Sequence, residues 1–141
     1  MSEYNKMSHE KSEYRISNRN ILIVTDNCEF GRLLADYFSL TNTIRITCSN
    51  RHGSSIISGF LPDIIINDID GNVHPEINLA RILRGIPSLC RIPVLIISGA
   101  DDDIAEANSG RNSAFSLLRK PVNLRELEQT IINILMIKLG K

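Results

Sequence analysis

Polar residues that could carry phosphoryl chemistry stand just after short apolar runs of the chain. Four such residues end four such runs: Asp26, Asp68, Ser98 and Lys120. A carboxylate can act as a nucleophile and form an aspartyl phosphate, and two carboxylates close together favour capture of a divalent cation, because their like charges repel. A lysine supplies a compact positive charge for a phosphate oxygen, and a serine hydroxyl can donate a hydrogen bond to another. These residue types therefore predict a site for a phosphoryl group.

The elements that must position these residues follow from the apolar pattern. The runs predict strands at 21–24, 44–48, 64–66, 94–97 and 115–118. Amphipathic stretches predict helices at about 29–40, 54–60, 75–84 and 123–139, and the segment 101–113 is loop-like with one or two helical turns. Strands that alternate with helices indicate the α/β class, with a parallel sheet covered on both faces. Because such sheets place their sites at the carboxyl ends of the strands, the four residues are expected to meet at one rim.

Length and composition favour one domain without nucleic-acid or membrane partners. The 141 residues are 43% hydrophobic, which is enough for one core, and 16 basic residues balance 16 acidic ones. Nucleic-acid-binding domains usually carry a basic excess, and no run approaches the ~18 apolar residues that span a membrane. We expect a polar tail at 1–19 and the domain at 20–141. Three widely spaced cysteines predict free thiols and a cytoplasmic protein.

Four segments give the chain a resemblance to a known family. They are Ile-Leu-Ile-Val-Thr-Asp at 21–26, Pro-Asp-Ile-Ile-Ile-Asn-Asp at 62–68, Ile-Pro-Val-Leu-Ile-Ile-Ser at 92–98 and Lys-Pro at 120–121. In this order and at these spacings they resemble the response-regulator receiver domains of the CheY-like superfamily. The resemblance covers about residues 20–139 and implies a flavodoxin-like, doubly wound (βα)5 fold. The five parallel strands would stand in the order 2-1-3-4-5.

The resemblance also implies a role for each residue at the rim. Asp68 would be the phosphoacceptor, and Ser98 and Lys120 would hold the phosphoryl group. Asp26 and Asp68 would bind Mg²⁺, with the backbone carbonyl of Asp70 as a further ligand. A cis peptide bond is expected between the lysine and the proline that follows it.

The function implied is signalling rather than enzymatic, with self-dephosphorylation as the expected activity. The chain would be a single-domain response regulator, or a receiver fragment, of a bacterial two-component phosphorelay. A sensor histidine kinase or a histidine phosphotransfer protein would supply the phosphoryl group, and a downstream protein would receive the signal. The chain is expected to be a monomer or a weak homodimer.

Several positions depart from the family pattern and leave alternatives open. Thr25 stands where the family usually has an acid, which predicts weaker Mg²⁺ binding, and Leu117 stands at the usual aromatic position. These departures favour a second hypothesis, a pseudo-receiver that serves as a phosphorylation-independent interaction module. A small flavodoxin-like ligand binder is less favoured, because the loop after the first strand lacks a phosphate cradle. Asp26 could instead cap a helix, and Asp70 could be a turn residue.

Overall fold

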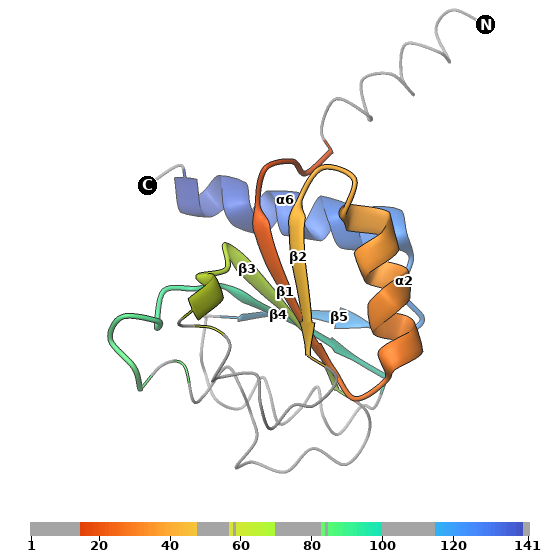
Figure 1. The fold of residues 1–141 in the computed structure, drawn as a ribbon, viewed down its shortest axis with the longest axis horizontal. Coiled ribbons are helices and arrows are strands. Elements are labelled where there is room, and N and C mark those ends of the chain that lie inside the picture. Colours follow the sequence, from red (N-terminus) through yellow and green to blue (C-terminus); the bar gives the residue numbers. More distant parts are fainter. Residues whose placement is uncertain are drawn as a thin grey trace, which may run out of the picture.

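The protein is built on a five-stranded parallel sheet with the strand order β2-β1-β3-β4-β5 (Figure 1). The computed structural model describes residues 15–47, 57, 59–69, 83, 85–99 and 115–139, with the backbone alone at 69, 115 and 137–139. The strands are β1 (Asn20–Thr25), β2 (Thr43–Thr47), β3 (Ile64–Ile69), β4 (Val94–Ser98) and β5 (Phe115–Arg119). The predicted α/β class and the predicted strand order are confirmed.

The apolar runs form the interior strands because those strands are covered on both faces. Ile21 to Thr25 of β1 and all of β4 are buried. In β2, by contrast, Thr43 and Arg45 are exposed while Thr47 is buried, as expected for an edge strand. In register, β1 pairs with β2 on one side and with β3 on the other. The carboxyl ends of the strands therefore lie along one rim.

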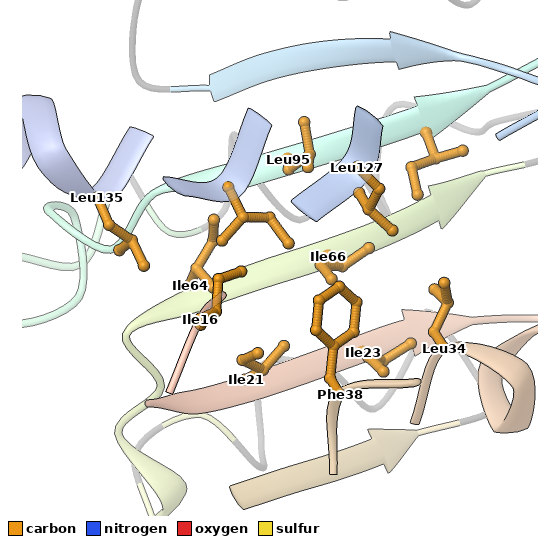
Figure 2. Packing of buried hydrophobic residues seen from close by; sticks show 12 residues of the cluster. Ile16, Ile21, Ile23, Leu34, Phe38, Ile64, Ile66, Leu95, Leu127 and Leu135 are labelled. Atoms are coloured by element: carbon orange, nitrogen blue, oxygen red, sulfur yellow. The ribbon is translucent and has the colours of Figure 1, made fainter. Parts of the chain in front are cut away.

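Two helices cover one face of this sheet, α2 (Cys28–Phe38) and α6 (Leu124–Leu139). Figure 2 shows how side chains from both helices meet the side chains of the strands in the main core. The buried members of this cluster are Ile16, Ile21, Ile23, Leu34, Phe38, Ile64, Ile66, Leu95, Ile97, Leu127, Ile131 and Leu135. A second cluster, which includes Leu22, Ile65 and Ile96, lies on the opposite face of the sheet. Strand alternation thus sends odd and even positions of β1 to different cores.

Asparagine side chains begin both helices. Asn27 Oδ1 accepts a hydrogen bond of 3.1 Å from the backbone N–H of Phe30. Asn123 Oδ1 accepts from the backbone N–H groups of Arg125 and Glu126 at 2.9 and 3.0 Å. Asn123 therefore caps α6. The cap of α2 is Asn27, so the alternative that Asp26 caps this helix is wrong.

Residues 15–19 pack onto the domain, although the sequence assigns them to a polar tail. Ile16 is buried in the main core, and its backbone N–H donates a 2.9 Å hydrogen bond to Glu128 Oε2 of α6. Arg15 Nε donates to the same oxygen at 3.1 Å, and Tyr37 Oη donates to Oε1 at 3.0 Å. The buried Glu128 carboxylate therefore ties the segment before β1 to both helices. The boundary between residues 19 and 20 stays a prediction.

The contact between Tyr37 and Glu128 predicts a loss of stability in alkali. Burial raises the pKa of Tyr37 above its ordinary value of 10.0, and the hydrogen bond to Glu128 raises this pKa further. The folded state thus keeps this proton when the unfolded chain has lost it. The stabilisation is complete below the unfolded pKa and is lost as the pH rises through the folded pKa.

Urea unfolding between about pH 9 and pH 11 checks this expectation. The free energy of unfolding should fall more steeply with pH in the wild type than in Tyr37→Phe. Other groups that titrate in this range affect both proteins alike, so the difference between the two slopes belongs to Tyr37. Equal slopes would contradict the assignment.

Some expectations fall on residues that the structure does not describe, and one on cysteine is wrong. Several predictions concern residues outside the described part of the chain: the tail up to residue 14, Asp70, the segment 101–113, and most of the helices at 54–60 and 75–84.

Cys28 is disulfide-bonded, whereas Cys90 is a free thiol, so the prediction of free thiols fails at Cys28. Among the described helices, none combines the length and the apolar character that crossing a membrane requires.

Candidate phosphoacceptor site at the carboxyl ends of the strands

Asp68 lies near the carboxyl end of the central strand β3, where the sheet buries it. Its register partners are Thr25 on β1 and Ile97 on β4. The residue is 2% exposed, so its carboxylate depends on neighbouring groups rather than on bulk water for compensation of its charge. A buried carboxylate is costly unless it is paired or hydrogen-bonded. Its two oxygens meet different partners.

Lys120 is the cation beside this carboxylate. Its Nζ lies 2.6 Å from Asp68 Oδ1, a distance at which the two groups form an ion pair. Oδ1 has no hydrogen-bond partner, so the contact with Lys120 is an ion pair without a hydrogen bond. The backbone N–H of Lys120 donates a 2.9 Å hydrogen bond to the carbonyl of Ser98, which holds the lysine against the end of β4. The peptide bond from Lys120 to Pro121 is cis, as expected.

Thr25 is the neutral neighbour of the carboxylate. It is fully buried, and its Oγ1 donates a 2.5 Å hydrogen bond to Asp68 Oδ2. Thr25, Asp68 and Lys120 therefore form one chain of contacts across β1, β3 and the end of β5. In the sequence, Thr25 is notable only because it stands where the receiver family usually has an acid, and its contact with Asp68 was not predicted. The signal that could have found it is register, because Thr25 ends β1 and pairs with Asp68, the residue before the end of the parallel strand β3.

The other predicted residues lie around this chain of contacts. Asp26 follows β1 directly and is exposed at the rim. Ser98 is fully buried at the end of β4, and its register partner on β3 is Ile69, the residue after Asp68. Asp70 lies outside the described residues. A Cβ added at Gly99 would meet Lys120 carbons at 3.6 Å, an ordinary contact, so the site does not require glycine at this position.

The residues present are compatible with a hard cation, with fewer charges than the family pattern has. The Asp68 carboxylate is buried and one of its oxygens lacks a hydrogen bond, and carboxylate oxygens suit Mg²⁺. Within the described part of the chain, however, no group of three or more His, Cys, Asp or Glu side chains is placed to hold a metal. The position of the second family acid holds the Thr25 hydroxyl. Asp26 and Asp68 are thus the described candidates for Mg²⁺.

Comparison with known proteins finds one curated relative and a set of similar solved structures. No family model matches the chain. A curated relative, the hybrid signal transduction histidine kinase D of Dictyostelium discoideum, is 22% identical over 142 residues; the alignment covers 100% of this chain but only 9% of that kinase. The chain thus spans less than a tenth of the length of this relative.

Solved structures show the fold. A response regulator from Desulfuromonas acetoxidans is 19% identical with a TM-score of 0.71, and the match covers 84% of this chain and 98% of that one. Chemotaxis protein CheY4 of Vibrio cholerae is 16% identical with a TM-score of 0.70, over 84% and 99% of the two chains. The signal receiver domain of a histidine kinase from Syntrophus aciditrophicus is 23% identical with a TM-score of 0.68, over 87% and 93%. The predicted resemblance is confirmed.

Proposed function

We propose that this chain, whose fold is that of response-regulator receiver domains, accepts a phosphoryl group on Asp68 in a two-component phosphorelay. The observation that carries the proposal is the Asp68 carboxylate, which is buried at the end of β3 and contacts Lys120 Nζ at 2.6 Å. Phosphoryl transfer needs a nucleophilic carboxylate beside a fixed cation, because the negative charge on the phosphoryl oxygens must be neutralised while the phosphoryl group is transferred.

Each residue of the site has a separate role in the proposed phosphoryl transfer. Asp68 Oδ1 attacks phosphorus, the Oδ1–P bond forms, and the bond from phosphorus to the donor atom breaks, with the electron pair going to the donor. Lys120 then pairs with a phosphoryl oxygen instead of with the bare carboxylate. Asp26 and Asp68, with the backbone carbonyl of Asp70, would hold Mg²⁺, which supplies further neutralisation of the phosphoryl charge. Ser98 would donate to another phosphoryl oxygen.

The partners follow from this role. A sensor histidine kinase or a histidine phosphotransfer protein would be the donor, as the kinase context of two of the similar proteins supports. A downstream protein would read the phosphorylated surface. Self-dephosphorylation is the activity expected of the chain itself.

Labelling with a small-molecule donor tests the proposal. Incubation with acetyl phosphate and Mg²⁺ should add one phosphoryl group to the wild type, seen as a mass gain that alkali removes. Asp68→Asn should show no gain, because the amide is not a nucleophile of this kind. Asp36→Asn is the matched control, since Asp36 is an exposed acid of α2 away from the strand ends. The absence of any gain in the wild type would contradict phosphoacceptance and favour the pseudo-receiver alternative.

A further inference from the structure

The side chain of Thr25 is held in place on both of its branches. A Cβ added at Gly31 of α2 would lie 3.0 Å from Thr25 Cγ2, so the helix approaches this methyl group closely because it has glycine there. The backbone N–H of Asn27 donates a 2.9 Å hydrogen bond to Thr25 Oγ1. The methyl group is fixed by the helix and the hydroxyl oxygen by the turn after β1. The direction of the hydroxyl group is thus set by the fold.

The hydroxyl hydrogen has two acceptors within reach, and the carboxylate is the stronger. Asp68 Oδ2 lies 2.5 Å from Oγ1, whereas the carbonyl oxygen of Asn27 lies at 3.3 Å. Hydrogen bonds to a charged acceptor are shorter and stronger than those between neutral groups. Because Oγ1 has one hydrogen and the Asn27 N–H occupies one of its lone pairs, the hydrogen goes to Asp68.

These contacts make the two oxygens of Asp68 unequal. Oδ2 receives the hydroxyl of Thr25, while Oδ1 faces Lys120 and receives no hydrogen bond. We propose that Thr25 is a positioning residue, whose hydroxyl holds the Asp68 carboxylate so that Oδ1 is the oxygen that attacks phosphorus. The inference rests on the proposed role of Asp68 as phosphoacceptor. With acetyl phosphate, the Oδ1–P bond forms, the bond from phosphorus to the acetyl oxygen breaks, and acetate leaves with the electron pair.

Two substitutions separate the hydroxyl from the shape of the side chain. Thr25→Val keeps both branches without the hydroxyl, and Thr25→Ser keeps the hydroxyl without the methyl group that faces Gly31. With acetyl phosphate and Mg²⁺, labelling of Thr25→Val should be slower than that of the wild type by roughly tenfold, the effect of about one lost hydrogen bond to a charged group. Thr25→Ser should label within about threefold of the wild-type rate.

Crystal structures of the wild type and the two variants supply the readout that labelling does not. In Thr25→Val the carboxylate of Asp68 should turn, and the contact of Oδ1 with Lys120 Nζ should be lost; in Thr25→Ser it should remain. If the contact between Asp68 Oδ1 and Lys120 Nζ is unchanged in Thr25→Val, the positioning role is overturned at any labelling rate. Labelling of Thr25→Val at the wild-type rate overturns it as well. If the wild type itself takes no label, the proposed function fails, and the orientation of Asp68 in Thr25→Val still decides the role of Thr25.

Discussion

Replacing Lys120 with methionine should lower the free energy of unfolding by about 2–3 kcal/mol and slow labelling by acetyl phosphate. Methionine keeps most of the length of the side chain but removes the cation that faces Asp68 Oδ1 at 2.6 Å. Removing one partner of a buried ion pair leaves the other charge without compensation, at a cost of about 3–5 kcal/mol when both partners are fully buried. The Lys120 side chain is 25% exposed, so water compensates part of this loss.

The two partners of this ion pair should have unequal effects on the free energy of unfolding. Asp68→Asn leaves a lysine that can reach water, so its cost in unfolding free energy should be below about 1 kcal/mol. In the double variant, Asp68→Asn with Lys120→Met, no buried charge is left alone, and most of the stability lost in Lys120→Met should return. Urea unfolding of the four proteins gives the coupling free energy directly. Equal costs for the two single substitutions would contradict the assignment of Asp68 as the buried partner.

Replacing Glu128 with alanine should lower the free energy of unfolding by about 2–3 kcal/mol. The carboxylate of Glu128 is buried and accepts hydrogen bonds from Arg15, from the backbone N–H of Ile16 and from Tyr37. The N–H of Ile16 would then be buried without a partner, which costs more than the mean value of a hydrogen bond. Residues 15–19 should lose their fixed place beside α2 and α6.

Glu126→Ala is the matched control for this substitution. Glu126 lies two residues earlier on the same helix and is exposed, so its replacement should cost less than about 1 kcal/mol, mainly through the helix dipole. Amide hydrogen exchange gives a second measurement, because the amide of Ile16 should lose its protection in Glu128→Ala and keep it in Glu126→Ala. A similar stability for both variants would show that Glu128 does not anchor the segment before β1.

The strands were predictable because their burial on both faces leaves unbroken apolar runs. Each of the five predicted strands corresponds to a strand of the sheet, and most predicted ends lie within one residue of the observed ones. The exception is β3, which continues to Ile69. There the apolar run stops at Ile66, but Asn67 and Asp68 keep strand pairing with β1 and β4. The polar side chains of Asn67 and Asp68 end the apolar run, so the sequence does not show that β3 continues. The backbone of these residues still pairs with the neighbouring strands, because backbone pairing does not depend on the side chain.

The interactions of single side chains were less predictable, because they depend on contacts between distant residues. Asp68 and Lys120 could be placed at the same rim from topology alone. That the Thr25 hydroxyl bonds to Asp68 required the register of β1 against β3, and the close approach of Gly31 required the packing of α2 on the sheet. The burial of Ile16 was missed for a related reason, since one apolar residue among polar ones carries no periodic signal.

The central claim, that Asp68 is the residue that takes the phosphoryl group, is tested most directly by locating the label in the chain. Borohydride reduces an acyl phosphate to the alcohol, so the phosphorylated aspartate becomes homoserine, which peptide mass spectrometry can assign to one position. After treatment with acetyl phosphate and Mg²⁺, homoserine is expected at position 68 and at no other aspartate. Homoserine at position 26 or at any other aspartate, with Asp68 unchanged, would contradict this claim.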